Sequence, residues 1–175
     1  MRRIFDRARI EACCGPLNAY HIVSAILPWV LFFGTAIALI VGWGRIPEQV
    51  PMHADFQGNV TGWGPKSTLI ILGAVYLVIN LTLWIVAYFP QSWNNGGRLR
   101  SVRLGGRKPN TVREYRLTLD LLCDLRLSMA LLFSGLLLWS AFGDPDRFPI
   151  WINAGVFVLI GLPLARYLIR LYWPQ

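Results

Sequence analysis

Charged residues are scarce in this sequence, and acidic residues are the scarcest. Only 15% of the 175 residues are charged, nine of them are acidic, and 55% are hydrophobic. Soluble domains average about 25% charged and about 45–50% apolar residues, so the composition excludes an ordinary soluble domain. The eight tryptophans fit a membrane location, because indole rings favour the boundary between water and lipid. The composition predicts an integral membrane protein.

Cysteine and histidine are also rare, with three and two copies. Cys13 and Cys14 are adjacent and Cys123 lies in an apolar run, so the spacing matches neither a disulfide framework nor a zinc motif. Together with His21, the two adjacent thiols are a weak signal for a metal, and His21 is better explained as an interfacial residue. We therefore predict no metal site, no cofactor and no catalytic residue.

Long apolar runs dominate the sequence. Four of them approach or exceed the ~20 residues that a helix needs to cross a membrane. The first contains Ala36-Ile37-Ala38, which resembles a signal-peptidase site, but it continues to Trp43, which favours a retained helix over a cleaved signal. We predict an all-α integral membrane protein with four transmembrane helices, at about residues 19–43, 68–89, 117–142 and 150–168.

The spans divide the chain into four parts. A basic leader occupies 1–18, and a two-span unit with a polar loop at 44–67 occupies 19–89. A basic loop follows at 90–116, in which Thr111 and Glu114 predict a helix start. A transmembrane helical hairpin occupies 117–175, with its turn centred on Pro145.

Basic residues gather on one side of the predicted spans. Thirteen Lys and Arg residues flank the spans on that side, against three on the other. Because positive charge is retained in the cytoplasm, both termini are predicted to be cytoplasmic and the loop at 44–67 to lie outside. This placement accounts for the net charge of +8 without nucleic acid. The basic loop is expected to attract anionic lipid headgroups, with a cytoplasmic protein as the alternative partner.

Four charges near the cytoplasmic ends of the last two spans have matching spacings. Asp120 and Asp124 are four residues apart, as are Arg166 and Arg170, so each pair shares a helix face. Folding the chain at Pro145 brings Asp124 level with Arg166, and Asp120 level with Arg170. We predict two intramembrane ion pairs that clasp the hairpin. The alternative is a proton or ion pathway.

Arg126 belongs to a different face of the same helix. It follows Asp124 by two residues and is therefore about 200° away around the helix. A charge within a membrane costs ~2.5–3.5 kcal/mol or more, so Arg126 requires a partner elsewhere in the bundle. In a transporter, Asp120, Asp124 and Arg126 are the residues expected to carry the substrate ion.

The polar loop at 44–67 is rich in residues that direct the backbone. Proline fixes φ and denies the backbone a helix, whereas glycine turns without Cβ strain. The loop is therefore predicted to leave the first span extended and then to turn. The prolines and glycines predicted to determine this backbone conformation are Pro47, Pro51, Gly58, Gly62 and Gly64.

Lys66 is unexpected at its position in this loop. It stands at a helix N-terminus, where the dipole is already positive, and on the side that is poor in lysine. A carboxylate would relieve both effects, and Glu48 and Asp55 lie in the same loop. An anionic ligand group would serve equally well.

His53 and Asp55 are the other polar candidates. Because they flank Ala54, an extended backbone points both side chains to the same side, as an acid–base or metal pair requires. Packing of His53 against Trp63 is the favoured structural explanation. We predict that ligand binding involves His53, Asp55, Trp63 and Lys66.

The loop residues follow the pattern Pro47-x-x-x-Pro51-x-His53-x-x-x-x-Gly58-x-x-x-Gly62-Trp63-Gly64-x-Lys66. Between two spans, this pattern resembles a bacterial membrane domain of unknown function that forms the N-terminal part of SdpI-type immunity proteins. Ile46 stands where leucine is usual. The resemblance covers about residues 19–89, and the further multi-span half of SdpI-type proteins has no match here.

The resemblance implies a multi-pass protein of the bacterial cytoplasmic membrane. In SdpI-type members it implies protection against a secreted peptide toxin and signalling by sequestering a repressor, and it names no catalytic residue. We expect a non-enzymatic immunity, sensing or envelope-recognition protein whose outer loop binds a peptide or envelope ligand. The alternatives are a transporter, an enzyme that uses His53 and Asp55, and an accessory subunit of a larger membrane complex.

Overall fold

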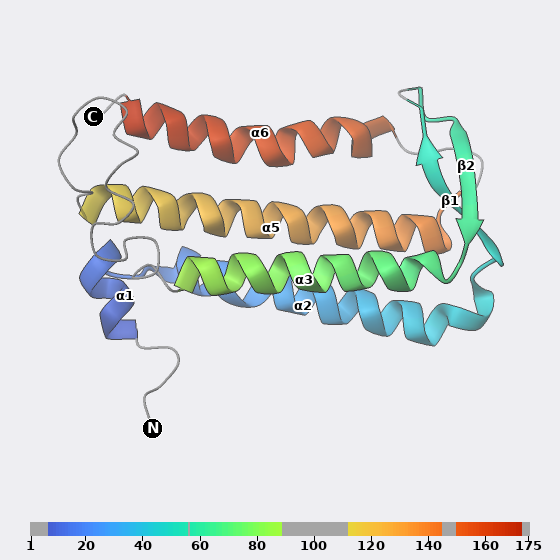
Figure 1. The fold of residues 1–175 in the computed structure, drawn as a ribbon, viewed down its shortest axis with the longest axis horizontal. Coiled ribbons are helices and arrows are strands. Elements are labelled where there is room, and N and C mark those ends of the chain that lie inside the picture. The colour runs from blue at the N-terminus through green and yellow to red at the C-terminus, as the bar shows by residue number, and fades with distance from the viewer. Residues whose placement is uncertain (1–6, 56, 89–111, 145–149, 173–175) are drawn as a thin grey trace, which may run out of the picture.

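Four long helices lie side by side in the computed structural model, which describes residues 7–55, 57–88, 112–144 and 150–172 (Figure 1). Each contains most or all of one predicted apolar run, and α5 begins before its run while α6 continues beyond its run. Their bounds are Ala19–Gly42 for α2, Thr68–Tyr88 for α3, Val112–Phe142 for α5 and Ile150–Tyr172 for α6.

The described part of the chain contains three helices that are long and apolar enough to cross a membrane, namely α2 with its 3-10 extension, α3 and α5. Large aliphatic side chains cover the outward faces of α2 and α3, and Ile40 and Val41 are 74% and 81% exposed. Lipid tails are as apolar as these side chains, so such faces fit a bilayer. The chain is a multi-pass membrane protein, and a fourth crossing by α6 stays a prediction.

Helix α5 is the centre of the bundle. It packs against α2, α3 and α6, whereas α6 packs chiefly against α5. Ser128, Ala130, Ser134 and Ala141 are buried along α5. Small residues of this kind let neighbouring helices approach closely in a membrane.

The loop between α2 and α3 contains the only strands in the described residues. After η1 (Trp43–Arg45), strand β1 (Gln49–Ala54) pairs antiparallel with β2 (Val60–Pro65). The predicted all-α class therefore needs one correction, because the extended loop closes into a β-hairpin. The two strands satisfy each other's backbone groups, which an isolated extended loop cannot do.

The bundle has two distinct ends. The β-hairpin covers one end, and α1 (Arg7–Cys14) lies at the other, where it packs against α5 and where α6 also ends (Figure 1). Most of the predicted basic loop, the turn at Pro145 and the capping residue Thr111 lie outside the described residues.

Candidate functional site

Asp55 organises the turn of the β-hairpin. Its carboxylate accepts hydrogen bonds from the Gln57 and Asn59 backbone N–H groups, at 2.9 and 2.8 Å, and from the Asn59 side-chain amide at 2.9 Å. Gly58 completes the turn with a φ of +88°, a conformation that favours glycine. The hydrogen bond from the Asn59 side chain is the main reason that the pKa of Asp55 lies below its usual value. Asp55 is therefore a turn residue.

His53 and Asp55 do not continue one regular strand. Strand β1 ends at Ala54, and the register is irregular between Pro51 and His53 and again between His53 and Ala54. The two-residue alternation that would align the two side chains is therefore interrupted.

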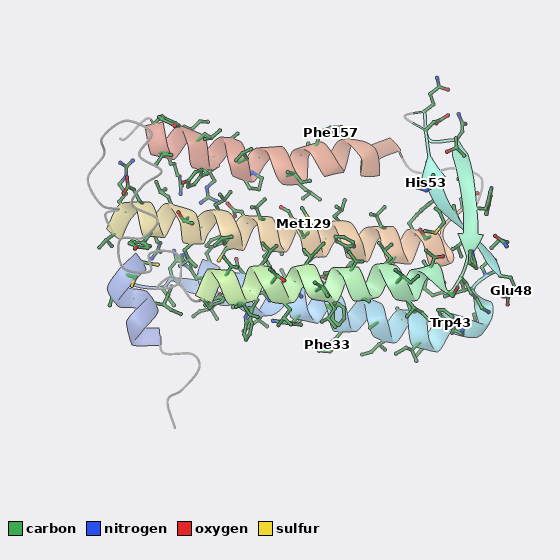
Figure 2. The ribbon with its side chains drawn as sticks, viewed as in Figure 1. Phe33, Trp43, Glu48, His53, Met129 and Phe157 are labelled. Atoms are coloured by element: carbon green, nitrogen blue, oxygen red, sulfur yellow. The ribbon has the colours of Figure 1, made fainter. Side chains whose placement is uncertain are left out.

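The register also changes the expected neighbour of His53. Gly62 lies opposite His53, whereas Trp63 lies opposite Pro51. A Cβ atom at Gly62 would lie 3.1 Å from His53 Cδ2, so the glycine makes room for the imidazole. His53 is exposed on β1 (Figure 2), and the Trp63 side chain is 49% exposed.

Lys66 has its carboxylate partner within the loop. Its Nζ lies 2.8 Å from Glu48 Oε1 and 5.6 Å from the centre of the Trp43 ring, and its backbone N–H donates to the Glu48 carbonyl at 3.0 Å. Trp43 and Glu48 lie where the hairpin joins the bundle (Figure 2). Of the two predicted carboxylates, Glu48 is thus the one that pairs with Lys66. Lys66 belongs to the base of the hairpin.

Two apolar side chains anchor the β-hairpin in the bundle. Ile46 and Val50 are 4% and 0% exposed and belong to the same core as Tyr76 and Leu137. Ser140 at the end of α5 donates a hydrogen bond to a backbone carbonyl of β1, at 3.3 Å. These contacts hold the hairpin in one position.

The remaining loop positions serve the hairpin in different ways. Pro47 is exposed, whereas Pro51 is buried and provides the carbonyl that Ser140 contacts. Gly64 is buried, and a Cβ there would lie 2.8 Å from Met52 Cγ. Only a glycine lets Met52 lie across β2 at this point.

Residues 30–78 match the model of a family described as a domain of unknown function, DUF1648. The match covers the hairpin together with the adjoining parts of α2 and α3. No curated protein and no solved structure matches the chain.

The predicted clasp lies outside residues 30–78, at the end of the bundle opposite the hairpin. Arg166 Nη1 lies 2.8 Å from Asp124 Oδ2, and Arg170 Nη1 lies 3.5 Å from Asp120 Oδ2. These are the two pairs that the helix spacing predicts. Hydrogen-bonded ion pairs between α5 and α6 fit a structural contact that holds these helices together.

Sequence reasoning missed three further members of this polar cluster. His21 is only 2% exposed, and its Nε2 lies 2.9 Å from Asp120 Oδ1. The Tyr20 hydroxyl donates to Asp124, and Arg116 lies 3.6 Å from Asp120. The interpretation of His21 as an interfacial side chain was therefore incomplete, because α5 buries it. The i,i+4 spacing of Arg116 and Asp120 was the sequence feature that could have predicted their ion pair.

We expect cysteines at positions 124 and 166 to be joined by a short bifunctional thiol reagent. The reason is that the two native side chains touch across α5 and α6. The experiment uses a chain without Cys13, Cys14 and Cys123, and electrophoresis after cleavage between the helices reports the crosslink. The control pair is 124 with 159, since position 159 lies two turns, about 10 Å, along α6. Equal crosslinking of both pairs would contradict the register.

Arg126 also finds its partners on other helices, as predicted. It is 1% exposed, its Nε donates to Asn80 Oδ1 on α3 at 2.8 Å, and its Nη1 donates to the Ser24 carbonyl on α2 at 3.2 Å. Its guanidinium lies 5.6 Å from the Trp29 ring centre. Asn80 and Ser24 were not recognised from the sequence. The sequence feature that could have identified Asn80 as a partner of Arg126 was its position as a single asparagine inside the second apolar run.

Cys13, Cys14 and Cys123 are free thiols. No group of three or more His, Cys, Asp and Glu residues suited to a metal occurs in the part of the chain that the structure describes. Burial raises the pKa of Cys14 to about 11. Burial therefore favours the neutral form of this thiol over the thiolate.

Proposed function

We propose that this chain is an immunity, sensing or envelope-recognition protein of the bacterial cytoplasmic membrane. In this proposal α6 is a fourth span, both termini are cytoplasmic and the β-hairpin lies outside. The excess of positive charge beside one set of span ends supports the orientation. The position of α1 and the end of α6 opposite the hairpin is consistent with it (Figure 1).

The ligand that the hairpin suits best is an extended peptide. In the described residues β2 pairs only with β1, so one edge of β2 has no strand beside it. An open edge that is fixed in position can accept a further strand through backbone hydrogen bonds, while side chains beside it provide selectivity. Trp63 is half-exposed on β2, and His53 is exposed on β1. The observation that carries the proposal is this anchored hairpin with an open edge.

A selection of phage-displayed peptides against the full chain in lipid nanodiscs tests this function. We expect the peptides that bind to lose about 10- to 30-fold in affinity on Trp63→Ala, because exposed aromatic anchors commonly dominate peptide binding. His53→Ala is expected to weaken binding as well. The matched control is Thr61→Ala, an exposed residue of the same strand. If no peptide is enriched, or if all three variants bind alike, the proposal is wrong.

A further inference from the structure

An apolar groove runs between α2 and α3 directly below the β-hairpin. Both helices pack closely on α5 and less on each other, and the space between them has a volume of about 510 Å³. This lies within the range of about 300–1,000 Å³ that is usual for ligand sites. Its walls include Phe32, Ala36, Leu39 and Trp43 from α2 and η1, with Gly73 from α3.

The groove has the length of one lipid leaflet. Phe32 and Trp43 both line it and are eleven residues apart, which corresponds to about 16 Å along a helix. Half of a bilayer's ~30 Å hydrocarbon core is about 15 Å. Gly73 helps to keep the groove open, since a Cβ atom added at this position would have no other atom within 4 Å. An acyl chain of the leaflet on the hairpin side therefore fits along it.

The hairpin end of the groove is cationic. Trp43 lines the groove, and Lys66 Nζ lies 5.6 Å from the centre of the same ring. Arg45 is exposed two residues after Trp43 and makes no ion pair with the other described residues. Glu48, the carboxylate paired with Lys66, is 84% exposed. The Lys66 side chain is only 22% exposed, but its Glu48 partner reaches it from solvent, and a partner of this kind contributes little. A phosphate can therefore take the place of Glu48 beside Lys66.

We propose that this groove binds an anionic glycerophospholipid from the leaflet on the hairpin side. One acyl chain lies between α2 and α3, and the headgroup phosphate contacts Lys66 and Arg45. The apolar groove suits the acyl chain, and Lys66, which lies beside the groove-lining Trp43, suits the phosphate. This site goes beyond the proposed recognition of peptides, which uses the open edge of β2 and the exposed His53 and Trp63.

Native mass spectrometry of the full chain, titrated with phosphatidylglycerol or with phosphatidylcholine of the same acyl chains, tests the site. Wild-type protein is expected to retain phosphatidylglycerol several-fold more strongly. Lys66→Ala should reduce that binding about fivefold, the effect of one basic residue near a lipid surface. Gly73→Phe should block both lipids, because the ring occupies the groove.

The matched control is Gly34→Phe. Gly34 is exposed on α2 outside the groove, and a Cβ there also meets nothing within 4 Å. Equal binding of the two lipids by wild type, or equal lipid binding by Gly73→Phe and Gly34→Phe, overturns the inference. Melting temperatures of all variants in the same detergent establish that they are folded. Peptide binding that persists in Gly73→Phe separates this site from the proposed function, since each can fail without the other.

Discussion

Replacement of Asn80 by leucine is expected to lower the free energy of unfolding by about 2–3 kcal/mol. Asn80 Oδ1 accepts the hydrogen bond from Arg126 Nε, and both side chains are 1% exposed. Leucine has the same branching at Cγ but is larger and accepts no hydrogen bond, so the guanidinium loses an acceptor in a place that water does not reach. Hydrogen bonds to charged groups contribute about 1.5–3 kcal/mol, and the Ser24 carbonyl, which still accepts from Arg126, does not replace the lost acceptor.

The double variant Asn80→Leu with Arg126→Met is the decisive control. It removes the donor and the acceptor together and leaves two apolar side chains, with methionine slightly smaller than the arginine it replaces. Replacing both partners of a buried polar contact is often nearly neutral. We therefore expect the double variant to be more stable than Asn80→Leu alone, as measured by chemical denaturation in one detergent. Additive losses from the two substitutions would show that the contact with Asn80 is not what stabilises Arg126.

Replacement of Val50 by aspartate is expected to detach the β-hairpin from the bundle while the helices stay folded. Val50 is fully buried among apolar side chains of the helices. An unpaired carboxylate in such a place costs several kcal/mol, which is more than a short hairpin can withstand. Because the hairpin is attached at one end of the bundle, its release is cheaper than unfolding of α2, α3 and α5.

Limited proteolysis with mass mapping measures this effect. Residues 49–65 are expected to be cleaved at least tenfold faster in Val50→Asp than in wild type, with unchanged helix content by circular dichroism. Gln49→Asp places the same charge on the preceding, exposed residue of β1 and is expected to behave as wild type. Equal protection of the hairpin in both variants would rule out Val50 as its anchor.

Hydropathy was sufficient to place the four long helices, whereas α1, within the predicted basic leader, was not foreseen. The four apolar runs coincide with α2, α3, α5 and α6 because burial in lipid depends on composition within a single segment. The pairing of Asp124 with Arg166 also followed from spacing. Both helices of an antiparallel hairpin rise by the same amount per residue, so distance from the turn determines which residues are level.

The loop was predicted less completely. Its prolines and glycines correctly indicated an extended path with turns, but the closing of that path into β1 and β2 was not foreseen. Irregular pairing on both sides of His53 set its neighbour as Gly62 instead of Trp63. Register depends on which backbone groups of the two strands form hydrogen bonds with each other. A shift by one residue changes the cross-strand neighbour of every residue.

The sequence by itself determined that this is a membrane protein, where its four long helices lie, and that Asp124 is level with Arg166 and Asp120 with Arg170. These properties are local or follow from the constant rise of a helix. Three contacts were decided by the tertiary structure alone. Asn80 accepts a hydrogen bond from Arg126, and α5 buries His21. Lys66 pairs with Glu48 rather than with Asp55. These contacts depend on how the helices are rotated about their axes and on the register of the strands. Packing of the whole bundle sets both, because every segment must satisfy its buried polar groups and fill its apolar contacts at the same time.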